Sequence, residues 1–189
     1  MQDVNIFPGR FQPFHSGHLR CCEDIYKENG NPVVILYMST TKFDKRKPFN
    51  NEIIKEELEI VKKNNDFIID IFEIKNPLAI SMINLCNEHG YNPTTWIAGE
   101  DRIESYQKML NGIRNPDIIK PELVKTERYC SATEVREAIL RGDMKTFEKL
   151  MPKGADKLWD KYKKEIDKVY SQNEGLISLV DFIKESLEK

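Results

Sequence analysis

Two of the three histidines in this chain lie three residues apart, in a turn rich in glycine and proline. His15 and His18 belong to the stretch G-R-F-Q-P-F-H-S-G-H, which runs from residue 9 to residue 18. A short apolar segment precedes it and an amphipathic pattern follows it. The first N–H groups of a helix lack partners within the helix and carry a partial positive charge. This strand–turn–helix pattern therefore predicts a phosphate site, with two imidazoles as additional donors. The alternative is that both histidines only cap and pack the helix.

A second polar segment lies more than 110 residues further along the chain. It reads S-A-T-E-V-R, from Ser131 to Arg136, and opens a helical pattern. Ser131 or Thr133 can cap that helix, and a capped N-terminus with a cation one turn inside suits an anion. Glu134 lies three residues after Ser131 but only one after Thr133, so we expect a poor match to a full capping box. The alternative is a plain N-cap without a ligand.

Two further segments carry charges that a bound nucleotide would attract. The loop from residue 40 to residue 50 has four basic residues, of which Lys42 and Lys47 are the candidates for a mobile charge near phosphate. The second segment is Gly99-Glu100-Asp101-Arg102. Its glycine would let the backbone approach a base or ribose closely, and the next three residues are charged. The alternatives are a solvated loop and an Asp101 that caps the next helix, with Glu104 three residues later.

Aromatic residues near these segments are candidates for a ring-binding pocket. Phe11, Phe14 and Phe49 lie in the predicted phosphate turn and at the end of the basic loop. Trp96 lies inside an apolar run, so we expect it in the core. His89 lies at a predicted helix end, where a positive charge is favourable, and we give it no further role.

The two motifs resemble those of a known superfamily. The stretch G-R-F-Q-P-F-H-x-G-H is similar to the signature of the H-x-G-H nucleotidyltransferases, in particular the adenylyltransferases that act on nicotinamide mononucleotide. The segment from Ser131 to Arg136 resembles their second signature, S-x-T-x-x-R. The resemblance covers roughly residues 3–150, whereas the basic loop departs from the adenylyltransferase pattern.

The resemblance implies roles for individual residues. His15 and His18 would contact the nucleotide phosphates and stabilise the transition state, with Lys42 and Arg136 as further catalytic candidates. The residues implied at the β- and γ-phosphates are Ser131, Thr133 and Arg136. The other residues implied in nucleotide binding are Gly9, Arg10, Phe11, Gly99, Asp101 and Arg102. The residues expected at the acceptor are Phe14, Lys47 and Phe49.

The reaction that the resemblance implies joins the α-phosphate of ATP to nicotinamide mononucleotide and releases pyrophosphate. Mg²⁺ is the expected cofactor, held mainly by substrate phosphates, because the sequence displays no carboxylate cage for it. One alternative is a cytidylyltransferase or another adenylyltransferase with a different phosphorylated acceptor. The other is a non-catalytic nucleotide sensor, which would have less need of both motifs.

Composition limits the partners. The 189-residue chain has a net charge of −2, which gives no basis for broad attraction to nucleic acid. No apolar run approaches the ~20 residues of a membrane span. The four cysteines form no C-x-x-C pair, so we expect free thiols in a reducing compartment. These features predict a cytoplasmic protein with small-molecule partners, ATP and a phosphorylated acceptor, and with no nucleic-acid or membrane partner.

Apolar runs alternate with helical patterns over about 130 residues. The expected strands are Val4–Phe7, Pro32–Met38, Asp66–Phe72, Thr94–Ala98 and Ile118–Val124. The expected helices between them are Gly17–Glu28, Asn51–Lys63, Pro77–Glu88 and Asp101–Leu110. This order predicts an α/β, Rossmann-like parallel sheet of about five strands, covered by helices on both faces. Ligands bind at the carboxyl ends of such strands, where both the first motif and Gly99 are expected.

The last part of the chain is expected to be helical only. We predict a nucleotidyltransferase domain over residues 1–150 and C-terminal helices over residues 151–189 that pack on it. The helices are expected at Met144–Leu150, Ala155–Tyr170 and Gly175–Leu187. The last one carries an apolar stripe of Ile177, Val180, Ile183 and Leu187. That stripe is expected to pack on the sheet domain, and the alternative is a contact between two copies in a homo-oligomer.

Overall fold

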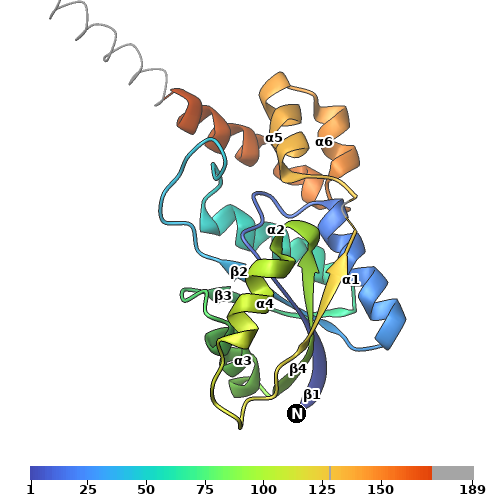
Figure 1. Cartoon of the computed structure of the whole chain (residues 1–189). Coiled ribbons are helices and arrows are strands. Elements are labelled where there is room, and N and C mark those ends of the chain that lie inside the picture. Colours follow the sequence, from blue (N-terminus) through green and yellow to red (C-terminus); the bar gives the residue numbers. More distant parts are fainter. Residues whose placement is uncertain (128, 172–189) are drawn as a thin grey trace, which may run out of the picture.

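The computed structural model of the chain describes residues 1–127 and 129–171. Its centre is a parallel sheet with the strand order β3-β2-β1-β4-β5 (Figure 1). The strands are β1 (Gln2–Gly9), β2 (Val33–Met38), β3 (Ile68–Ile74), β4 (Tyr91–Gly99) and β5 (Glu122–Thr126). The predicted Rossmann-like sheet of about five strands is confirmed. The chain order reverses between β1 and β4, and such a switch point opens a crevice at the carboxyl ends.

Helices cover both faces of this sheet (Figure 1). The helices on one face are α1 (Ser16–Asn29), α2 (Asn51–Lys63), α5 (Ala132–Arg141) and α6 (Met144–Leu150). Those on the other face are α3 (Ala79–Glu88) and α4 (Ile103–Asn111). Short 3₁₀ turns form η1 (Glu100–Arg102) and η2 (Ala155–Leu158), and residues 159–171 are helical.

The apolar runs form central strands because both sides of the sheet are buried. On β2, Val34 and Leu36 pack with α3 and α4, whereas Val33 and Ile35 pack with α1 and α2. Trp96 on β4 is fully buried beside α4, as expected of a core residue. The strands are thereby fixed in position, and their carboxyl ends present the loops that carry both motifs.

Several element boundaries differ from the predictions by a few residues, for example those of β1, β3 and α4, and two of the differences have a clear local cause or consequence. The helix expected from Pro77 begins at Ala79, and its N-cap Leu78 makes no side-chain capping bond. The strand expected at Ile118–Val124 lies instead at Glu122–Thr126. Pro121 precedes it because proline has no N–H to donate to a strand pair. The shift brings Thr126 to the carboxyl edge of the sheet, level with Gly99.

The C-terminal segment joins the main core as far as it is described. Met151, Ala155, Leu158, Tyr162 and Ile166 are buried in the same cluster as α1, α2 and α5. Residues 151–169 therefore pack on the sheet domain and share its core. The apolar stripe predicted between Ile177 and Leu187 lies outside the described residues.

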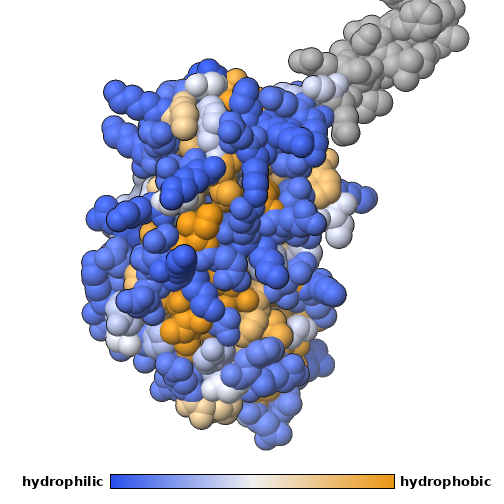
Figure 2. Space-filling model, turned by 180° about the vertical axis from the view of Figure 1, so that it is seen from behind, coloured by the Kyte–Doolittle hydropathy of each residue, from blue (hydrophilic) through white to orange (hydrophobic). Residues whose placement is uncertain are grey.

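The face seen from behind is mostly hydrophilic (Figure 2). Seen from behind, hydrophobic residues gather in the middle of the face and hydrophilic residues surround them (Figure 2). Within residues 1–127 and 129–171, no helix is long and apolar enough to span a membrane. All four cysteines are free thiols, and three of them are buried.

Candidate active site

A cavity of about 650 Å³ lies at the carboxyl ends of β1 and β4. Its wall includes the end of β1, the first turn of α1, η1, part of α4 and the N-terminus of α5. The N-termini of α1 and α5 thus reach the same space, and each contributes N–H groups and a partial positive charge. These N–H groups suit an anion, and they lie where the sheet topology predicts a ligand site.

Nine of the predicted site residues line this cavity. They are Gly9, Arg10, Phe11, His15, His18, Gly99, Asp101, Arg102 and Ser131. The structure thereby brings together segments that lie more than 110 residues apart in the chain. The predicted residues outside its lining are Phe14, Lys42, Lys47, Phe49, Thr133 and Arg136.

His15 and His18 cap α1 with their own side chains. The His18 N–H donates to His15 Nδ1, and the His15 N–H donates to His18 Nδ1, each over 3.3 Å. The two imidazoles stack with ring centroids 3.7 Å apart and 17° between their planes. Each Nδ1 is an acceptor, so each neutral ring carries its proton on Nε2. Both residues therefore cap the helix, and both also line the cavity, so capping does not exclude the predicted role in phosphate binding.

Phenylalanines hold the His18 ring in place. The rings of Phe7, Phe11 and Phe14 lie 5.8, 5.2 and 5.3 Å from it, centroid to centroid. Phe11 adopts a left-handed φ of 48°, and its ring lies where a Cβ on Gly9 would be only 2.5 Å away. Glycine is therefore required at position 9 because a side chain there would displace this ring.

The prediction that Phe14 lines the acceptor pocket is wrong. Phe14 is fully buried and packs beneath His18. Phe49, predicted for the same pocket, is also fully buried and packs edge-on against Tyr162 at 4.6 Å. Both aromatic rings belong to the main core, where Phe14 packs among Phe7, Phe11 and His18 and Phe49 packs against the helical segment 159–171.

The second motif forms a complete capping box, contrary to our expectation. The Glu134 N–H donates to Ser131 Oγ over 3.3 Å, and the Ser131 N–H donates to Glu134 Oε2 over 2.7 Å. Ser131 is therefore the N-cap, and Thr133 lies inside the first turn. The Ser131 hydroxyl also donates to Glu134. These bonds fix the conformation of Ser131, which lines the cavity.

Arg136 lies beside the first motif without lining the cavity. Its Nη1 donates to the carbonyl of Gln12 over 2.6 Å, and its Nη2 donates to Thr133 Oγ1 over 3.1 Å. Partial burial lowers the pKa of the guanidinium, although arginine remains charged. In this arrangement Arg136 holds the motif together rather than reaching into the cavity, which differs from the predicted direct phosphate contact.

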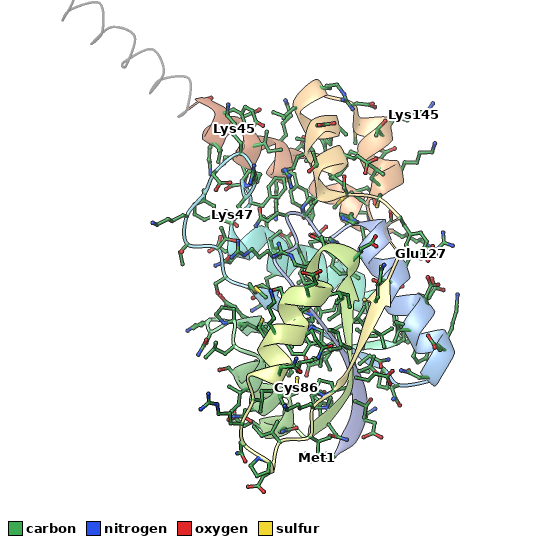
Figure 3. All side chains as sticks on the ribbon, viewed as in Figure 1. Met1, Lys45, Lys47, Cys86, Glu127 and Lys145 are labelled. Atoms are coloured by element: carbon green, nitrogen blue, oxygen red, sulfur yellow. The ribbon has the colours of Figure 1, made fainter. Side chains whose placement is uncertain are left out.

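The basic loop also lies outside the cavity. Lys42 is exposed, and Lys47 pairs with Asp44 across 3.4 Å. Lys45 Nζ lies 4.9 Å from the ring centroid of Tyr170, so the loop contacts the helical segment 159–171 (Figure 3). Neither Lys42 nor Lys47 reaches a cavity wall in this arrangement, which does not match the predicted role of either residue in phosphate binding.

The segment from Gly99 to Arg102 forms another part of the cavity wall. Asp101 pairs with Arg102 at 3.6 Å, and Glu100 pairs with Lys125 at 2.5 Å. The alternative role of Asp101 as a helix cap is wrong, because residues 100–102 form a 3₁₀ turn and α4 begins without a side-chain cap. The wall thus carries charges of both signs.

The sequence of residues 6–138 matches the cytidylyltransferase-like family. The chain belongs to this family. This membership confirms the predicted resemblance of the two motifs to the nucleotidyltransferase superfamily. The matched residues include both motifs and all of the sheet except the first residues of β1.

Two relatives are similar to this cytidylyltransferase-like chain in sequence. It is 26% identical over 131 residues to the probable nicotinate-nucleotide adenylyltransferase of Methylacidiphilum infernorum, covering 66% of the chain and 64% of that protein. It is 28% identical over 167 residues to the nicotinamide-nucleotide adenylyltransferase of Pyrobaculum arsenaticum, covering 78% of the chain and 82% of that protein. The chain therefore spans less than two thirds of the first relative.

Two solved structures share the fold. The bifunctional NMN adenylyltransferase/ADP ribose pyrophosphatase of Francisella tularensis aligns with a TM-score of 0.65 at 19% identity, covering 98% of this chain and 56% of that one. The nicotinic acid mononucleotide adenylyltransferase of Plasmodium falciparum aligns with a TM-score of 0.59 at 15% identity, covering 87% and 98%. At these identities the likeness establishes the fold of the cytidylyltransferase-like domain.

Sequence reasoning missed two buried residues that support the candidate site, Gln12 and Glu57. Gln12 is buried, and its amide donates to the Phe49 carbonyl over 3.0 Å while accepting the Phe49 N–H over 2.9 Å. Glu57 is buried on α2 and accepts the Phe14 N–H over 3.0 Å. Its position between Ile54 and Val61 on the apolar face of α2 was the available signal. A carboxyl on a buried face needs a polar partner, and that partner is the first motif.

Proposed function

We propose that this chain is an adenylyltransferase that joins the α-phosphate of ATP to nicotinamide mononucleotide and releases pyrophosphate. The observation that carries the proposal is the stacked pair of His15 and His18, held by Nδ1 in a cavity that two helix N-termini share. Phosphoryl chemistry needs positioned donors and positive potential more than covalent help from the protein.

The proposed reaction is an in-line displacement. A phosphate oxygen of the acceptor forms a bond to the α-phosphorus of ATP, and the bond to the bridging α,β-oxygen breaks. The Nε2–H groups of His15 and His18 would donate to the α-phosphate as its negative charge shifts. The N-terminus of α5, capped by Ser131, would hold the pyrophosphate that leaves. Arg136 would support this step by keeping α5 against the first motif.

A divalent cation would be held chiefly by the substrate. Across residues 1–127 and 129–171, no group of three or more His, Cys, Asp and Glu side chains converges to form a metal site. The carboxylates of Glu100 and Asp101 line the cavity but already pair with Lys125 and Arg102. This donor set fits Mg²⁺ bound by phosphate oxygens and water, where it would offset the charge of the triphosphate.

The choice of substrates rests on the relatives. Both sequence relatives are named for adenylyl transfer to a pyridine mononucleotide, one to the nicotinate form and one to the nicotinamide form. The family description names cytidylyl transfer. The resemblance of the first motif, G-R-F-Q-P-F-H-S-G-H, to the adenylyltransferases that act on nicotinamide mononucleotide favours that acceptor. We also propose a cytoplasmic location, because all four cysteines are free thiols, as is typical of reducing compartments.

The test is pyrophosphate release with ATP, CTP, GTP or UTP and a small set of acceptors, with Mg²⁺ present. Nicotinamide mononucleotide, nicotinate mononucleotide and a phosphorylated alcohol are the essential acceptors. Activity with ATP and nicotinamide mononucleotide, with NAD identified by mass, is the expected result. Activity with CTP and the alcohol would replace the substrates and keep the site. Binding of ATP without turnover on any acceptor would overturn the proposal in favour of a sensor.

A further inference from the structure

The thiol of Cys130 connects the two motifs at the catalytic cavity. Cys130 immediately precedes the capping residue Ser131 and lines the cavity. Its Sγ lies 3.2 Å from His15 Nδ1 and 3.2 Å from the backbone nitrogen of Gly17. The Ser16 hydroxyl lies 3.8 Å away. One sulfur atom thus contacts the first turn of α1 and one of the two proposed catalytic rings.

The surrounding groups set the direction of these bonds. The Gly17 N–H donates to Sγ, and the His18 N–H donates to His15 Nδ1. An Nδ1 that accepts from a backbone amide has no proton of its own, so the thiol S–H is the donor in its contact with His15. Both contacts at Nδ1 therefore favour the tautomer that carries the proton on Nε2.

The residue before Cys130 is bound to the side of α1. The neighbouring Tyr129 hydroxyl donates to Asp24 over 2.8 Å, and the Arg20 guanidinium lies 4.0 Å from the Tyr129 ring centroid. Arg20 and Asp24 both belong to α1, the helix that His15 caps. The segment that carries the thiol is thus anchored to the helix whose first turn the thiol contacts, so its sulfur has a fixed position relative to His15.

We propose that Cys130 is a positioning residue whose thiol orients the His15 ring and keeps its proton on Nε2. The inference rests on the proposed adenylyl transfer, because it gives His15 a donor role toward the α-phosphate. Cys130 touches no reacting atom in this scheme. Its effect is to keep the His15 donor aligned before substrate arrives, so that little reorganisation is needed in the transition state.

The kinetic test compares Cys130→Ala with Cys130→Ser. Loss of one hydrogen bond that orients a donor predicts about a 10-fold lower kcat for Cys130→Ala, with KM changed less than about 2-fold. Cys130→Ser keeps a hydroxyl at the same place and is expected to recover most of the lost kcat. Cys86→Ala is the matched control, since Cys86 is buried with α3 and α4 on the opposite face of the sheet (Figure 3).

A second measurement is independent of turnover. The chain has only three histidines, so ¹⁵N-labelled imidazole spectra can be assigned with His89→Ala and His18→Ala variants. We expect His15 to be the Nε2–H tautomer in the wild type and a tautomer mixture in Cys130→Ala. An unchanged tautomer together with an unchanged kcat in Cys130→Ala would overturn the inference. A wild type that forms no product would instead count against the proposed function, while the spectra would still test the role of Cys130.

Discussion

The Arg136 guanidinium donates to the carbonyl of Gln12 across 124 positions of the chain, over 2.6 Å. Gln12 lies in the first motif and Arg136 in the second, so this bond joins the two. The Gln12 side chain is in turn bonded to the backbone of Phe49. The turn that places His15 is therefore held between α5 and the end of the basic loop.

We predict that Arg136→Ala lowers both stability and turnover. A hydrogen bond from a charged, partly buried donor contributes about 1.5–3 kcal/mol, and its loss leaves the Gln12 carbonyl without this partner. Urea unfolding should show a decrease of that size, and kcat should fall because the first turn of α1 loses its support. Arg141→Ala is the control on the same helix. Arg141 is exposed, and its ion pair with Glu137, at 3.9 Å, is long and solvent-exposed. Its effect should stay within about 0.5 kcal/mol. Equal effects of the two substitutions would contradict the role given to Arg136.

His18→Ala is expected to separate catalysis from folding. Removal of a well-aimed donor to a developing charge lowers turnover by ~10²–10³-fold. The lost contact with the His15 N–H should lower the free energy of unfolding by about 1 kcal/mol, and the lost packing against the phenylalanine rings should lower it further, but the variant should still fold. Steady-state pyrophosphate release and thermal unfolding measure the two effects. His89→Ala, at the C-terminus of α3, is the control and should keep wild-type kcat. A variant that unfolds but keeps normal activity per folded molecule would make His18 structural.

Gly17→Ala is expected to be harmful although alanine favours helices. An added Cβ would lie 2.8 Å from Cys130 Sγ and 3.1 Å from His15 Nδ1. In an open helix the change would stabilise the protein by about 1 kcal/mol, whereas here we expect lower stability and lower kcat. A double-mutant cycle with Cys130→Ala checks the cause. Gly17→Ala should lower the free energy of unfolding less in the Cys130→Ala background than in the wild type. An equal decrease in both backgrounds would mean that the strain does not come from the Cys130 side chain.

Glu57 predicts a pH-dependent stability. Burial raises the pKa of its carboxyl well above the ordinary value of 4.5, against the smaller opposing effects of Tyr162 and the Phe14 amide. The folded protein therefore retains this proton more strongly than the unfolded chain. Its stabilising contribution is complete below pH 4.5 and is lost as the pH rises through the folded pKa.

We therefore expect Glu57→Gln, which cannot ionise, to gain stability relative to the wild type as the pH increases above 4.5. Urea unfolding of both proteins at several pH values up to 8 measures this difference. Glu56→Gln is the neighbouring control, because the Glu56 carboxyl is exposed and paired with Lys161. A difference between wild type and Glu57→Gln that stays constant with pH would mean that Glu57 titrates alike in the folded and unfolded states.

Local patterns in the sequence determined much of this molecule. Apolar runs indicated the strands, and their alternation with helices indicated a parallel sheet, at whose carboxyl ends a ligand site was expected. Both motifs were visible because capping and phosphate binding depend on neighbouring residues. The gathering of His15, Gly99 and Ser131 around one cavity followed from that topology.

Only the tertiary structure decided which distant residues these side chains contact. Arg136 points to the Gln12 carbonyl, Phe14 and Phe49 enter the core, and Cys130 meets His15. Each of these outcomes depends on a contact between residues far apart in the chain, or on cover supplied by residues 159–171. Spacing along the chain fixes which face of an element a residue occupies. The partner that it meets there is fixed by how the elements pack, and that information is not local.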